Sequence, residues 1–154
     1  MIKKHWTEVK GIKSDKDGFK GMLQHFIWTK EDGCEHFAMR LMEFEPYGCT
    51  SYHSHREEHE FFLLEGDMAI VDKEGRETRL NAGDTAYVAP DEPHQVKNVG
   101  DGVMRLLCII PILPGGDGKA PAPRPDGRDY VRAHDRTPLT SPHLVCRILL
   151  EKKN

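Results

Sequence analysis

The amino-acid sequence predicts an all-β protein, built as an antiparallel sandwich or barrel. Short apolar runs of strand length follow one another at close, regular spacing, and Gly, Asp, Asn and Pro separate them. Apolar residues roughly alternate within several of these runs, as in strands with one buried face, and little of the chain has a helical pattern. At 154 residues the chain is long enough to bury a core as one domain.

Eight runs form the predicted strands. The first two alternate on either side of the turn-like sequence KEDG, and the next two follow a histidine-rich segment. The turns DKEG, NAGD and VGDG separate the later runs, the last of which is almost entirely apolar. In chain order the predicted strands are 19–28, 36–44, 59–66, 67–71, 76–80, 85–90, 94–98 and 103–110.

The two ends of the chain differ from this pattern. From Pro111 the sequence is rich in Pro and Gly, which disfavours regular structure and predicts a surface segment. The apolar tail HLVCRILLEKKN (143–154) either pairs with an edge strand or a neighbouring subunit or remains flexible, and the N-terminal KKHWTEV poses the same alternatives. We divide the chain into N-terminal strands and a turn (1–36), a barrel core (37–111), and a linker with a tail strand (112–154).

Composition and charge narrow the function. A formal net charge of −3 gives no basic surface for nucleic acid, and no apolar run approaches the roughly 18 residues of a membrane span. The N-terminal MIKKHWTEVK lacks the apolar stretch of a secretory signal. Four scattered cysteines without a CxxC pair favour reduced thiols. We therefore expect a cytoplasmic protein that binds neither nucleic acid nor membranes.

Three histidines lie within seven residues of the segment HSHREEHE, directly before an apolar run. If this segment is extended, His53, His55 and His59 project to the same face, because side chains alternate along a strand. A fourth histidine, His94, opens a later strand after the loop APDEP, whose prolines stiffen it. An exposed polar strand edge would explain His-x-His alone. Since neutral imidazole is the commonest transition-metal ligand, all four together favour a metal site.

Two segments resemble the paired motifs of the cupin superfamily. They are GCTSYHSHREEHEFFLLEG and GDTAYVAPDEPHQVKN, and they occur in the family's order within residues 37–111. Gly48 and Gly66 bracket the first motif, and we expect tight turns with positive φ at both. The resemblance implies a cupin double-stranded β-helix, a jelly-roll-like barrel, forming a single domain with extended N- and C-terminal segments. It also implies a dimer with one metal ion inside each barrel.

The family's first motif commonly supplies two histidines and a glutamate, and its second motif supplies one more histidine. Here His59 takes the third position, whereas Glu60 is one residue out of register and should point away from the barrel. Ala89 and Asp91 stand where proline and glycine are frequent. The pattern resembles a subgroup of small single-domain cupins with a four-histidine site. It implies four metal ligands: His53, His55, His59 and His94.

The predicted ligand set carries no negative charge. It leaves the charge of a divalent ion uncompensated, so bound water becomes more acidic and anionic substrates are attracted. The set suits one divalent transition-metal ion, with manganese or iron favoured and nickel, cobalt, copper or zinc compatible. An octahedral ion would keep two open positions. Zinc held tetrahedrally by all four histidines would instead be closed and structural.

Strand parity and the resemblance suggest which other side chains face the ion. Arg40 could pair with a substrate carboxylate, or lie at the barrel mouth with its head hydrated. Cys108 could be redox-active, or pack as a small hydrophobe. Tyr52 has the opposite parity and should pack. The side chains expected to point inward are Arg40, Met42, Phe44, Phe61, Leu63, Leu106 and Cys108.

Three classes of function fit these features. The first is a mononuclear metal enzyme acting on a small organic molecule, and here an oxygenase or dioxygenase is favoured, with Arg40 and Cys108 as candidate catalytic residues. The second is a non-redox isomerase, lyase or decarboxylase that uses the ion as a Lewis acid. The third is a non-catalytic module that binds a small ligand. Because the barrel hosts many chemistries, fold alone does not decide among them. We expect a homodimer.

Overall fold

The computed structural model describes residues 1–14 and 17–122, and the backbone of 131–132. Antiparallel strands and two single 3₁₀ turns make up the regular structure of this part of the chain. In chain order they are η1 (Trp6–Glu8), β1 (Ile12–Lys13), β2 (Lys20–Trp28), η2 (Lys30–Asp32), β3 (Phe37–Cys49), β4 (His53–Ser54), β5 (His59–Glu65), β6 (Met68–Val71), β7 (Glu77–Leu80), β8 (Thr85–Val88), β9 (Gln95–Asn98), β10 (Met104–Pro111) and β11 (Val131–Arg132).

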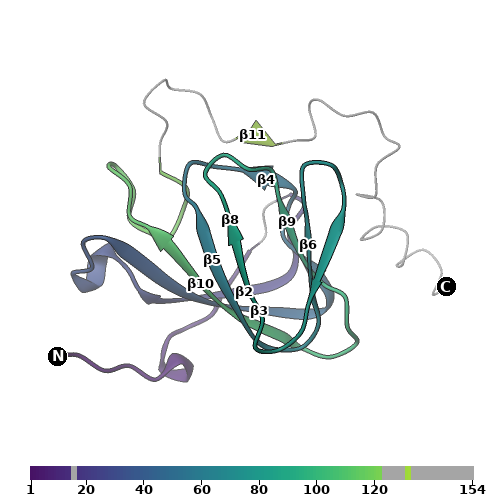
Figure 1. Ribbon diagram of the computed structural model, residues 1–154. Helices are drawn as coiled ribbons and strands as arrows, with labels where there is room; N and C mark the ends of the chain where they lie inside the picture. Colours follow the sequence, from purple (N-terminus) through teal and green to yellow (C-terminus); the bar gives the residue numbers. More distant parts are fainter. Residues whose placement is uncertain (15–16, 123–130, 133–154) are drawn as a thin grey trace.

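The strands curl into a nearly closed barrel (Figure 1). Seven of them follow the order β7-β6-β9-β3-β10-β5-β8, β2 adds to β3, and β1 adds to β2. Every described pair is antiparallel. The predicted all-β cupin barrel is confirmed. The path ends at β7 and β8, so the barrel is open between these two strands.

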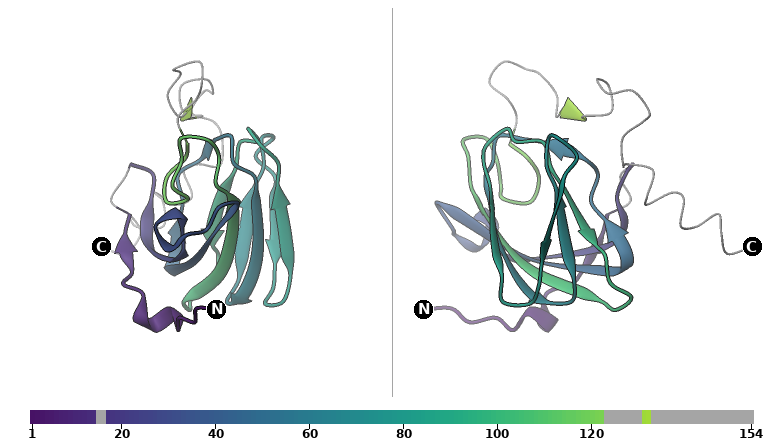
Figure 2. Two further views of the ribbon diagram at one scale, coloured as in Figure 1. Left: turned by 90° about the vertical axis from the view of Figure 1, so that its left-hand side faces the viewer. Right: turned by 45° about the vertical axis from the view of Figure 1, so that its right-hand side comes forward.

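The core lies inside the barrel and is formed by buried side chains from β2, β3 and the strands β5 to β10. The two views of Figure 2 show these strands curled around that interior. Burial alternates along β10 and along most of β5, as the sequence pattern predicts for strands with one face inward. Leu63 and Leu106 are fully buried, and each such side chain contributes about 2 kcal/mol through removal of apolar surface from water. The inward orientation expected for Met42, Phe44 and Phe61 is confirmed.

Strand β3 is longer than predicted, and Gly48 does not form the expected turn. The strand continues to Cys49, and positive φ falls on Tyr47 (60°) rather than on Gly48. A Cβ at Gly48 would lie 2.8 Å from the carbonyl oxygen of Gly21, so glycine is needed for close approach of two strands. The register of β2 against β3 shifts near this point, and the distortion lets Cys49 pair with β9 as well. Gly66 does adopt the expected positive φ, 86°.

The N-terminal segment is neither a strand nor free of the barrel. It forms the short 3₁₀ turn η1, and His25 on β2 donates from Nδ1 to the carbonyl oxygen of Val9 at 2.7 Å. The Trp6 ring meets the His25 ring edge-on at 5.5 Å. These contacts cover the outer face of β2. The predicted tail strand 143–154 lies outside the described residues.

Candidate metal centre

The four predicted histidines come together at the end of the barrel that carries β4. His53 lies on β4 and His55 just beyond it, His59 begins β5, and His94 directly precedes β9. All four are buried. The backbones of His53 and His94 form a mutual bridge with N–H···O distances of 3.0 and 2.8 Å. This bridge ties the two sequence motifs together directly at the site.

The imidazole rings are close enough to share one ion. The candidate ligand nitrogens of His53, His55 and His94 all lie within 4.8 Å of one another. His59 joins this group through His55, since their Nε2 atoms are 2.9 Å apart. Two nitrogens bound at about 2.1 Å and a right angle to one ion would be about 3.0 Å apart. The parity expected of this segment is confirmed, because His59 is 4% exposed whereas Glu60 points to solvent.

Hydrogen bonds from the outer ring nitrogens orient the imidazoles. His53 Nδ1 donates to the carbonyl oxygen of Ser51 at 2.7 Å, and His94 Nδ1 donates to that of Glu92 at 2.8 Å. An N–H held at Nδ1 leaves the lone pair on Nε2, the tautomer in which Nε2 can bind a metal. The positive φ of Asp91 (60°) explains why the family frequently has glycine at this position in the same loop.

Burial favours the uncharged form of His53, His59 and His94. It lowers the pKa of His53 and His59 well below the usual 6.5, and lowers the pKa of His94 to about 4. Charge repulsion from the neighbouring imidazoles also lowers these pKa values, because a second positive charge is disfavoured beside a first. A metal binds neutral imidazole, so the donor set fits a transition-metal ion at neutral pH.

Arg40 and Cys108 meet behind His59. Arg40 Nη2 donates to Cys108 Sγ at 3.0 Å, and His59 Nδ1 lies 3.2 Å from the same sulfur. Arg40 is only 8% exposed, so the alternative of a hydrated arginine at the barrel mouth is wrong. Its Nε is buried without a hydrogen-bond partner. Burial raises the pKa of the Cys108 thiol, which favours the protonated form.

The sequence analysis missed Glu57, a buried carboxylate beside the site. Its Oε2 lies 3.2 Å from His55 Nδ1, but the pair is not aligned as a hydrogen bond, and both atoms have no other partner. Its Oε1 accepts a 2.6 Å hydrogen bond from the backbone N–H of Ala122. Glu57 follows His55 by two residues and so has the same strand parity, the one signal that could have identified it.

A cavity of about 720 Å³ reaches the four histidines, a volume suited to a small organic ligand. Its exposed wall is more apolar than polar, and its charged side chains include Arg40 on β3 and Lys119 on the segment that follows β10. The predicted surface segment therefore also forms part of the cavity wall. Its apolar side chains are Ile12, Phe19, Phe26, Met42, Phe61, Ala120, Pro121 and Val96.

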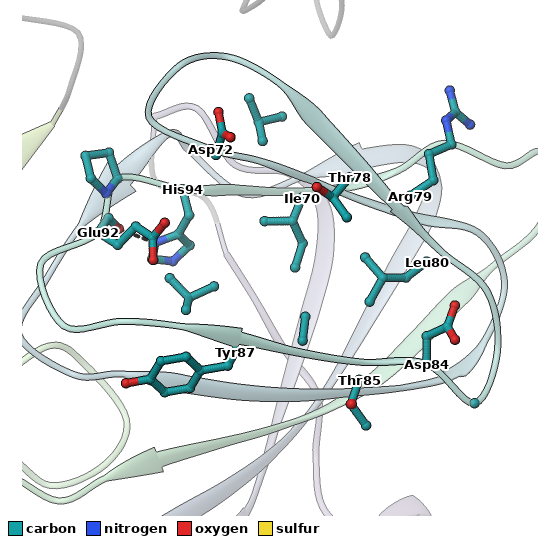
Figure 3. Close-up of a pocket in the computed structure, with 15 residues that line it drawn as sticks. Ile70, Asp72, Thr78, Arg79, Leu80, Asp84, Thr85, Tyr87, Glu92 and His94 are labelled. Atoms are coloured by element: carbon teal, nitrogen blue, oxygen red, sulfur yellow. Dashed lines mark hydrogen bonds between the residues drawn. The ribbon is translucent and has the colours of Figure 1, made fainter.

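A second cavity of about 600 Å³ lies where the barrel is open between β7 and β8 (Figure 3). Ile70 and Leu80 project into it, and His94 lies at one end beside Glu92. His94 thus lines both cavities. The candidate metal centre belongs to the first cavity, because that cavity also contains the other three histidines.

Comparisons with known proteins agree with this architecture. Residues 40–110 match the family model described as the cupin domain, and with the barrel fold this supports membership of the cupin superfamily. Among curated proteins, 60 residues are 30% identical to an uncharacterized protein of Methanocaldococcus jannaschii, MJ1618. That match covers 38% of this chain and 47% of the other, so the chain spans about half the length of this relative.

Several solved structures share the barrel. The polyketide cyclase RemF from Streptomyces resistomycificus is 29% identical with a TM-score of 0.68, over 72% of this chain and 79% of that one. A predicted oxalate decarboxylase from Thermotoga maritima is 22% identical with a TM-score of 0.65, over 73% and 100%. A sugar phosphate isomerase from Silicibacter pomeroyi is 20% identical with a TM-score of 0.65, over 90% and 97%. The last two show a common fold only.

The described residues contain no helix that is long and apolar enough to cross a membrane. Among these residues Cys34 and Cys108 are free thiols, as expected from their scattered positions.

Proposed function

We propose that this protein is a mononuclear metal-dependent cupin enzyme that acts on a small organic molecule with chelating oxygen atoms. The observation that carries the proposal is the convergence of four buried imidazoles on a cavity of about 720 Å³. Burying four imidazoles costs free energy that an apolar core would not, and a metal ligand set accounts for that cost.

In this proposal each part of the site has a separate task. His53, His55, His59 and His94 hold one divalent ion, which supplies Lewis acidity and open coordination positions when bound. Arg40 lines the cavity and offers its guanidinium group to an anionic oxygen of the substrate. The apolar walls, among them Phe26 and Phe61, exclude water and strengthen that attraction.

Two reaction classes fit this arrangement. An oxygenase or dioxygenase is the class favoured by the sequence, because open coordination positions beside imidazoles suit oxygen or a chelating enolate and apolar walls suit carbon substrates. A non-redox reaction, in which the metal stabilises an enolate during isomerisation, elimination, decarboxylation or ring closure, is the second class. Similarity to the polyketide cyclase RemF supports this second class. Glu57 does not act as a free base in either class while its carboxylate accepts the hydrogen bond from the Ala122 N–H.

One experiment separates these classes. Protein loaded with manganese, iron, cobalt, nickel, copper or zinc is incubated with β-diketones, catechols and aromatic polyketones, under air and under argon. We expect turnover that requires a bound metal. Oxygen uptake and loss of activity under argon identify an oxygenase, whereas equal turnover without oxygen identifies Lewis-acid chemistry. Binding of these compounds with no turnover by any metal form would refute the enzyme proposal and leave a small-ligand-binding protein.

A further inference from the structure

Glu57 stands between the metal centre and the segment that covers the cavity. The carboxylate is only 3% exposed, although an ionised group gains most from water. One oxygen holds Ala122 N–H at 2.6 Å, and the other faces His55 Nδ1 at 3.2 Å. In the metal-binding tautomer His55 carries a proton on Nδ1, and the Glu57 carboxylate opposite it is a hydrogen-bond acceptor, as the backbone carbonyl oxygens are for His53 and His94.

The segment on the other side of Glu57 is fixed to the barrel at several points. Lys30 N–H donates to the Asp117 carbonyl oxygen at 3.2 Å, and Lys119 forms a 2.6 Å ion pair with Glu31. Lys119 also lies in the cavity wall, next to Ala120 and Pro121. A continuous series of contacts therefore runs from the cavity wall through Ala122 and Glu57 to His55.

We propose that Glu57 is a positioning residue that orients His55 for metal binding and couples the cavity-covering segment 117–122 to the metal centre. This inference rests on the proposed metal site and deepens it. His55 bound to a metal through Nε2 would carry its proton on Nδ1 and could donate it to Glu57 Oε2, which already lies 3.2 Å away. The carboxylate then holds Ala122 more tightly, and because such coupling is reciprocal, a firmly closed segment favours the metal-bound site.

Glu57→Gln tests this role with almost no change in volume. A carboxylate accepts hydrogen bonds at both oxygens, but an amide accepts at one end and donates at the other. Whichever way the amide turns, it faces an N–H with its own N–H, either at His55 or at Ala122. We expect metal affinity, measured by chelator competition, to fall by about 10- to 100-fold. The visible spectrum of the cobalt(II) form should change as well.

The matched control is Glu60→Gln, which removes the same charge three residues away on the exposed face of β5. It should retain wild-type metal affinity and the wild-type cobalt spectrum. Hydrogen exchange provides the second measurement. In the wild type, metal binding should slow exchange of the Ala122 amide by about fivefold or more, and Glu57→Gln should abolish that dependence on metal.

Ala122→Pro approaches the same contact from the other side, because proline has no N–H to donate. It leaves Glu57 and His55 unaltered and should still weaken metal binding. It also decides the question if Glu57→Gln fails to fold. Wild-type affinity and an unchanged cobalt spectrum in either folded variant would overturn the role of Glu57 while the proposed function stands. Failure of the wild-type protein to bind any transition metal would instead overturn the proposed function itself.

Discussion

Acidification should destabilise the metal-free protein well before its carboxylates titrate. His94 has a pKa of about 4 in the folded protein, against about 6.5 in an unfolded chain, because burial disfavours its charged form. Between these two values the unfolded state binds the additional proton. Unfolding is therefore favoured as the pH falls, and the stability lost in this window is regained as the pH rises through 6.5.

The magnitude follows from the difference between the two pKa values. A difference of roughly 2.5 pKa units lowers the free energy of unfolding by about 3 kcal/mol once the pH lies below both values. Most of this stability, about 2 to 3 kcal/mol, is already lost at pH 4.5. His53 and His59 have lowered pKa values and add to the loss. Glu43 and Glu57 have lowered pKa values too, but carboxylates contribute mainly below about pH 4.5.

The assay is urea unfolding of chelator-treated protein at pH 7.5, 6.0, 5.0 and 4.5. Wild-type stability should fall over this range, and His94→Gln should lose less because the substituted side chain does not titrate. Transition metal added at pH 7.5 should stabilise the wild type through binding to the folded state, and this gain should shrink toward pH 5. A wild-type stability that stays constant from pH 7.5 to 4.5 would show that the imidazoles are not buried in neutral form.

Three further predictions concern the ligand set, the core and the outer surface. His59→Ala should lose most of the bound metal by elemental analysis while Glu60→Gln keeps one ion per chain; the reverse result would place the third ligand at Glu60. Leu63→Ala should lower the free energy of unfolding by about 2 to 5 kcal/mol, because the fully buried side chain leaves a cavity, and a loss below 1 kcal/mol would contradict that packing. Light scattering at micromolar concentration should show a dimer, because Phe62 and Leu64 on the outer face of β5 are 44% and 40% exposed and need cover. A monomeric wild type at this concentration, or a dimer that persists in Leu64→Lys, would argue against this face as the interface.

Local patterns in the sequence were sufficient for the barrel strands and for the shared face of His53, His55 and His59. Alternation along β10 follows from burial of one strand face, and the same period of two places His53, His55 and His59 on one side. The proline-containing loop predicted a fixed position for His94, and the backbone bridge to His53 bears this out. Alternation and the shared face depend on residues near one another in the chain, whereas the approach of His94 to His53 was implied by the resemblance to the paired cupin motifs.

Tertiary structure alone decided which groups surround the histidines. Glu57 meets Ala122 across 65 positions of the chain, and Arg40 meets Cys108 across 68. Contacts over such separations depend on how strands curve, shift register and end. The bulge near Gly48 and the opening between β7 and β8 are set by those same features. A periodic pattern gives the face on which a side chain lies, but the partner it meets there is determined only when the whole sheet has closed.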